Sequence, residues 1–122
     1  MLMKDAALCG HVILVVEDDT LIAFDLQKNL EDAGAQVAHA GVQDALELVA
    51  QRSLSAAVLD CHPVSRERRA LVRRLKQRGV PFLFYSAQPP ADVTTERGAP
   101  FIAKPCPPEK IIAAVRYLLR RF

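Results

Sequence analysis

The stretch VILVVEDD, residues 12–19, decides the fold. Its first five residues are aliphatic and mostly β-branched, and three acids follow at 17–19. A short continuous apolar run of this kind is typical of a parallel strand that is buried on both faces. We therefore predict a buried strand over residues 12–16, with a cluster of acids at its carboxyl end.

Outward from this stretch, strand-like and helix-like patterns alternate along the chain. Further strands are expected at 36–40, 56–60, 82–86 and 101–103. Helices are expected from Thr20 to a stop at Gly34, over 44–51, from 66 or 67 to 78, and from Pro108 onward, with Asp19 or Thr20 as the first cap. This alternation predicts right-handed βαβ units, an α/β fold with a doubly wound parallel sheet and helices on both faces.

Composition limits the classes of protein to consider. The 122 residues make one domain, and 51% apolar with 25% charged residues excludes a disordered chain. The net charge of +2 gives no argument for nucleic-acid binding. Three cysteines without paired spacing argue against a secreted disulfide scaffold. No membrane segment or signal peptide is recognisable, so a cytoplasmic protein is the expectation.

Polar residues stand at the carboxyl ends of the predicted strands. They are Glu17 and Asp18 after the first strand, then Asp60, Ser86 and Lys104. In a parallel sheet these ends share one edge, where ligands bind. Clustered carboxylates repel one another, and a divalent cation with oxygen ligands would relieve that repulsion. A lysine and a hydroxyl beside it suit the remaining oxygens of a phosphoryl group.

Each of these residues has an ordinary explanation when taken alone. An acid after a strand is usually a loop residue or a helix cap, and a Lys-Pro pair is usually a turn. The functional interpretation depends on the whole set meeting at one edge of the sheet.

Four stretches together resemble the receiver (CheY-like) domain of two-component response regulators. They are VILVVEDD (12–19), AAVLD (56–60), PFLFYSA (81–87) and FIAKP (101–105). The resemblance covers residues 11–122 as a receiver domain and leaves 1–10 as an N-terminal extension. It implies a flavodoxin-like sheet of five strands in the order 2-1-3-4-5. Pro89 and Pro90 predict that the fourth helix is short or irregular.

The resemblance assigns a phosphorylation site. Asp60 would accept the phosphoryl group. Glu17 and Asp18 would bind Mg²⁺, or Mn²⁺, together with Asp60 and the backbone carbonyl of His62. Lys104 would pair with the phosphoryl group.

The resemblance also assigns the switch residues. Ser86 and the small Ala87 after it match the switch hydroxyl and its neighbour. Phe101 matches the switch aromatic, and Pro105 is the candidate for a cis peptide bond.

The function implied is that of a phosphoacceptor signalling domain rather than an enzyme with external turnover. It would take a phosphoryl group from a sensor histidine kinase or a phosphotransfer protein in a Mg²⁺-dependent reaction. A conformational switch would then signal to a protein partner. The chain shows no fused DNA-binding domain and no membrane insertion, and a homodimer is left open.

Two alternatives stay open. Positions 64 and 68, where the family pattern has Pro and Gly, hold Val64 and Arg68. This departure motivates an unphosphorylated protein-interaction module on the same fold. A phosphatase with Asp60 as nucleophile would need a second aspartate two residues later, where His62 stands.

Three further features have ordinary explanations. The helix at 66–78 is rich in arginine and could dock an acidic partner or RNA, but a solvated outer face is the simpler interpretation. Cys61 and Cys106 follow the acceptor and the Lys-Pro pair, and we interpret them as small packed thiols rather than a redox gate. His62 could contact the phosphoryl group or be an exposed loop residue.

Overall fold

A computed structural model describes residues 7–60, 65–87 and 99–121. Its five strands form one parallel sheet in the order β2-β1-β3-β4-β5, which confirms the predicted topology. The strands are β1 (Val12–Val16), β2 (Gln36–Ala40), β3 (Ala56–Leu59), β4 (Phe82–Ser86) and β5 (Phe101–Ala103).

Within the described residues, four helices accompany the sheet: α1 (Thr20–Asp32), α2 (Val42–Gln51), α3 (Arg66–Gln77) and α4 (Pro108–Arg121). The short helix expected between the fourth and fifth strands falls on 88–98, which lie outside the described residues. Of the helices that the structure does describe, none combines the length and the apolarity needed to span a bilayer.

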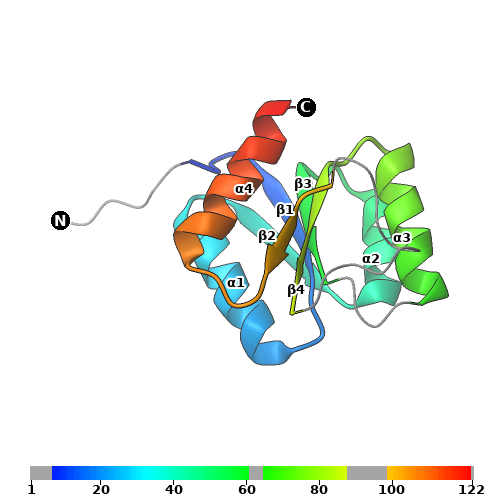
Figure 1. Ribbon diagram of the computed structural model, residues 1–122. Helices are drawn as coiled ribbons and strands as arrows, with labels where there is room; N and C mark the ends of the chain where they lie inside the picture. The colour runs from blue at the N-terminus through cyan, green and yellow to red at the C-terminus, as the bar shows by residue number, and fades with distance from the viewer. Residues whose placement is uncertain (1–6, 61–64, 88–98, 122) are drawn as a thin grey trace.

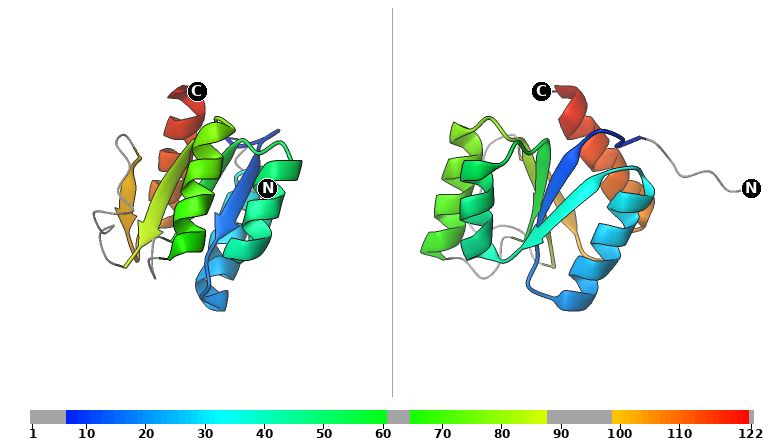
Figure 2. Two further views of the ribbon diagram at one scale, coloured as in Figure 1. Left: turned by 90° about the vertical axis from the view of Figure 1, so that its right-hand side faces the viewer. Right: turned by 180° about the vertical axis from the view of Figure 1, so that it is seen from behind.

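The helices cover both faces of the sheet, as the sequence predicts. α1 and α4 lie on one face, and α2 and α3 lie on the other (Figures 1 and 2). β1 serves both layers, because successive side chains of a strand point to opposite faces. Ile13 and Val15 pack with α1 and α4, whereas Leu14 and Val16 pack with α2 and α3.

One of the two predicted caps of α1 is confirmed, whereas the boundaries of α2 and β3 differ slightly from the prediction. The cap of α1 is Asp19, whose side chain accepts from the backbone N–H groups of Leu21 and Ile22. α2 begins two residues earlier than expected, after Gly41, which offers no capping side chain. β3 ends at Leu59, so Asp60 is the first residue beyond the strand. Because Asp60 lies beyond the strand, the direction of its side chain is not set by the alternation of side chains between the two faces of the sheet.

The described part of the predicted N-terminal extension packs into the core. Leu8 is fully buried, and its N–H donates to the carbonyl of Ala33 at 2.8 Å. Gly34 lies beside this segment with φ +102°, and a Cβ there would sit 3.1 Å from the backbone N of Cys9. Glycine satisfies both demands at this position. Residues 7–10 are thus an integral part of the layer formed by α1 and α4.

Candidate functional site

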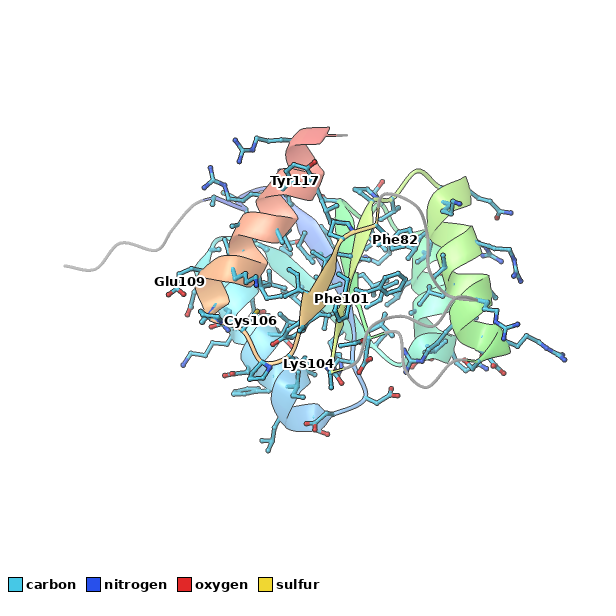
Figure 3. All side chains as sticks on the ribbon, viewed as in Figure 1. Phe82, Phe101, Lys104, Cys106, Glu109 and Tyr117 are labelled. Carbon is cyan, nitrogen blue, oxygen red and sulfur yellow. The ribbon has the colours of Figure 1, made fainter. Side chains whose placement is uncertain are left out.

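The predicted site residues meet at one edge of the sheet. Glu17 and Asp18 follow β1, Asp60 follows β3, Ser86 ends β4, and Lys104 follows β5. Figure 3 shows Lys104 just past the end of β5, where the chain leaves toward α4. Parallel strands bring these five residues together although they are spread over most of the chain.

Lys104 joins two of the acids. Its Nζ donates to Oε1 of Glu17 at 2.5 Å and to Oδ2 of Asp60 at 2.9 Å. Burial by itself would lower the pKa of Lys104, but the hydrogen bonds and charges of Glu17 and Asp60 outweigh burial and raise it. The ammonium group therefore stays charged and links β1, β3 and β5. It also lies 5.6 Å from the centre of the Tyr85 ring.

Glu17 is almost fully buried, with 5% of its surface exposed. Besides the Lys104 ammonium, its Oε2 accepts from the backbone N–H of Asp19 at 3.0 Å. Nε2 of His39 donates to the backbone carbonyl of Glu17 at 3.0 Å, which ties the end of β1 to β2. A buried carboxylate needs such partners, and here both of its oxygens have one.

Ser86 holds the second oxygen of Asp60. Its Oγ donates to Oδ1 of Asp60 at 2.6 Å, and Ser86 itself is fully buried. Each carboxylate oxygen of Asp60 is thus oriented from a different part of the sheet, Oδ1 from the neighbouring strand β4 and Oδ2 from the residue that follows β5. Such fixed donors orient the carboxylate before any reaction takes place.

Arg68 also belongs to this cluster, although no sequence motif predicts it there. Its guanidinium donates to Oδ2 of Asp18 at 2.8 Å and to the backbone carbonyl of Asp60 at 2.5 Å. Only 6% of Arg68 is exposed. The predicted solvated face of this helix is therefore wrong for Arg68, although Arg66 and Arg69 are exposed as expected.

The sequence did contain a signal for Arg68. In α3 the buried residues are Arg68, Leu71, Val72 and Leu75, so the arginine occupies the first position of the apolar stripe. Ser65 caps the helix by accepting from the N–H of Arg68 at 3.0 Å, which fixes where this residue enters the site.

The other predicted residues that the structure describes take no part in the hydrogen bonds and ion pairs of this cluster. Ala87 is exposed directly after β4, and Phe101 is 37% exposed on β5. The Lys104–Pro105 peptide bond is cis. Cys106 is a free, half-buried thiol. Cys61 and His62, including the backbone carbonyl expected to bind a metal, lie outside the described residues.

The acids do not fit a divalent metal in this arrangement. Among the residues described, no group of three or more His, Cys, Asp or Glu side chains is arranged to hold an ion. The oxygens of Asp60 accept from Ser86 and Lys104, and Asp18 is paired with Arg68. Mg²⁺ needs carboxylate oxygens directed at one octahedral centre. Two side-chain cations and the Ser86 hydroxyl hold these oxygens instead. The predicted Mg²⁺ site stays a prediction.

Comparison with solved structures identifies the fold. The receiver domain of a signal transduction histidine kinase from Syntrophus aciditrophicus matches with a TM-score of 0.77 at 26% identity, covering 92% of each chain. A CheY-like receiver domain protein from Methanospirillum hungatei has a TM-score of 0.80 at 23% identity, covering 91% of this chain and 94% of its own. A receiver protein from Sinorhizobium medicae has 0.76 at 21%, covering 90% and 94%.

Sequence comparison adds nothing to this result. No protein-family model matches the chain, and no curated protein matches it. The chain has the receiver fold, and it resembles the receiver domains of two-component response regulators over most of its length.

Proposed function

We propose that this protein is a phosphoacceptor signalling domain in which Asp60 receives a phosphoryl group from a phosphohistidine. The observation that carries the proposal is the orientation of the Asp60 carboxylate, with Ser86 Oγ at 2.6 Å and Lys104 Nζ at 2.9 Å. Asp60 lies just past the carboxyl end of β3, where a parallel sheet binds ligands.

The transfer step needs little covalent chemistry from the protein. A lone pair on a carboxylate oxygen of Asp60 forms a bond to phosphorus while the phosphorus–nitrogen bond of the phosphohistidine breaks. The electron pair of that bond stays on the imidazole nitrogen, which leaves. Such transfers pass through loose transition states, so positioning and charge stabilisation supply most of the catalysis.

Positive charge at the site comes from the chain itself. Lys104 and Arg68 both contact Asp60, the first at its side chain and the second at its backbone carbonyl. Lys104 suits the phosphoryl oxygens, because an ammonium group forms charge-assisted hydrogen bonds with them. Once Asp60 is phosphorylated, its oxygens no longer match the present partners, and Ser86 and Lys104 must rearrange. That rearrangement is the proposed signal to a protein partner.

The partners follow from this chemistry. The donor is a histidine-phosphorylated sensor kinase or phosphotransfer protein, which we expect in the cytoplasm. The protein would promote its own phosphorylation and dephosphorylation, so it is a signalling component rather than an enzyme that turns over an external substrate.

The test is the intact mass of the protein after incubation with a small phosphodonor and, separately, with a phosphorylated phosphotransfer domain. We expect one added phosphoryl group in the wild type and none in Asp60→Asn. Asp44→Asn, an exposed acid in the first turn of α2, is the matched control and should be phosphorylated like the wild type. Phosphate uptake by Asp60→Asn would contradict the assignment.

One observation favours the second candidate, an unphosphorylated interaction module. The five charged groups of the cluster already form ion pairs with one another, so they do not need a phosphoryl group as a partner. No phosphoryl uptake from either donor, with the fold intact, would favour this candidate.

A further inference from the structure

We propose that the guanidinium of Arg68 is the resident cation of this site and holds the place that a divalent metal ion would need. This inference rests on the proposed function for its biological meaning, but its test does not depend on phosphorylation. The predicted consequence is that the wild-type protein binds divalent cations weakly and that removing Arg68 opens a metal site.

The geometry of Arg68 carries the proposal. The guanidinium spans two oxygens that belong to different strand ends, Oδ2 of Asp18 after β1 and the backbone carbonyl of Asp60 after β3. A carboxylate oxygen and a carbonyl oxygen brought together in this way are the donors that a hard divalent ion accepts. In this structure the two oxygens instead accept hydrogen bonds from the two terminal nitrogens of the planar Arg68 guanidinium.

The charges of the cluster agree with the geometry. Glu17, Asp18 and Asp60 supply three carboxylates, and Lys104 and Arg68 supply two cations. A divalent ion entering here would have to approach two positive groups, and it would find only one negative charge uncompensated. Removing Arg68 leaves two uncompensated negative charges, which would attract a divalent ion more strongly.

The position of Arg68 is not explained by the stability of its helix. It lies three residues after the cap Ser65, in the first turn of α3. Positive side chains are unfavourable at that end, because the helix dipole is itself positive there. Burial of the guanidinium adds a desolvation cost. The contacts with Asp18 and Asp60 are what offset both costs, so the arginine is placed for the site.

The substitution that tests the proposal should leave the protein folded. The Asp18 side chain is 61% exposed, so loss of its partner exposes a carboxylate that water can solvate. Arg68→Gln removes the charge. Arg68→Met also removes it and keeps an unbranched apolar stem for packing. Arg69→Gln removes an exposed charge from the next position of the same helix and is the matched control.

The experiment is a titration of Mn²⁺, in which electron paramagnetic resonance measures the free ion. We expect Arg68→Gln and Arg68→Met to bind Mn²⁺ at least about tenfold more tightly than the wild type, a change of about 1.4 kcal/mol. Arg69→Gln should bind like the wild type. Asp18→Asn added to Arg68→Gln should abolish the gain, which places the ion at this site.

Equal Mn²⁺ binding by the wild type and a folded Arg68 variant would overturn the proposal. A gain of binding in a protein that never takes up phosphate would support this inference and contradict the proposed function. Phosphorylation of Asp60 with no change of Mn²⁺ binding in the Arg68 variants would support the proposed function and contradict this inference.

Discussion

Ser86 Oγ donates a hydrogen bond of 2.6 Å to Oδ1 of Asp60, and no part of Ser86 is exposed to solvent. The hydroxyl is thus fixed on an oxygen of the proposed phosphoacceptor from the neighbouring strand β4. A phosphoryl group on Asp60 would offer new acceptor oxygens to the same hydroxyl. The contact therefore connects the chemical state of Asp60 to the position of β4.

Replacing Ser86 with alanine should lower stability. The change removes the donor to a charged oxygen while Asp60 keeps its contact with Lys104, so we expect a loss of about 1.5–3 kcal/mol. Urea unfolding followed by circular dichroism measures it. Ser53→Ala, at an exposed position, should stay within about 0.5 kcal/mol of the wild type. Equal stability of Ser86→Ala and wild type would show that this hydrogen bond contributes nothing.

Replacing Lys104 with methionine should destabilise the protein more strongly. The buried carboxylate of Glu17 and that of Asp60 would lose the cation between them, and breaking such a buried pair costs about 3–5 kcal/mol. Lys110→Met, an exposed lysine of α4, is the control and should have little effect. Chemical unfolding of both variants gives the comparison, and a Lys104→Met loss as small as that of the control would contradict the expectation.

The contribution of Lys104 should disappear only in alkali. Its pKa in the folded protein is raised above the ordinary value of 10.5, because the two carboxylates outweigh its burial. A lysine whose pKa is raised by folding stabilises the folded state fully when the pH is below its pKa in the unfolded chain. This stabilisation is lost as the pH rises through its pKa in the folded protein. The stability difference between wild type and Lys104→Met should be constant up to about pH 9.5 and shrink at higher pH. A difference that shrinks between about pH 7 and 9 would contradict this assignment.

Leu8 should behave as a core residue. It is fully buried beside α1, so Leu8→Ala should cost about 2–5 kcal/mol, the usual range for a leucine truncated in a core. Leu21→Ala removes the same atoms from a residue that is 80% exposed and should change stability little. Thermal unfolding of the two variants side by side tests the prediction. Similar midpoints would show that the N-terminal segment does not support the fold.

Arg68 should also set how strongly phosphorylation depends on metal. If phosphate uptake is followed with Mg²⁺ and with a chelator, the ratio of the two rates should be larger in Arg68→Gln than in the wild type. The variant has lost its own cation, so it relies more on an added one. Arg69→Gln should keep the wild-type ratio. An unchanged ratio in Arg68→Gln would mean that its guanidinium does not substitute for the ion.

Most of the fold could be predicted from the sequence, because apolar runs and turn residues agree with each other. The strands at 12–16, 36–40, 82–86 and 101–103 have the predicted bounds. The start of α2 lies two residues before the predicted one, and Gly41 has no side-chain cap that would mark it in the sequence. Leu8 belongs to the core and not to a separate extension, and no local pattern predicts this because its partner Ala33 is far away in the sequence.

Apart from Arg68, the members of the described site could be predicted from the sequence, but the pairs that they form could not. Glu17, Asp60 and Lys104 each follow a predicted strand, and in a parallel sheet the carboxyl ends of the strands lie at one edge. Periodicity gives no information about which side chain will reach across the edge. Asp18 and Arg68 are 50 residues apart, and their contact depends on the three-dimensional start of α3. The departure from the family pattern at position 68 marked the place but did not identify the partner.

The outermost strand β5 has only three residues, and Ile102 is the single buried one among them. Among the described residues its backbone pairs with β4 alone, and Ile102 is its one buried apolar side chain, so apolar packing contributes little to holding β5 in place. The residue that follows β5, Lys104, forms ion pairs with Glu17 and Asp60, which follow the more central strands β1 and β3. This edge of the sheet is therefore held by ion pairs more than by apolar packing. A change in the charge of Asp60 would weaken or strengthen the attachment of β5.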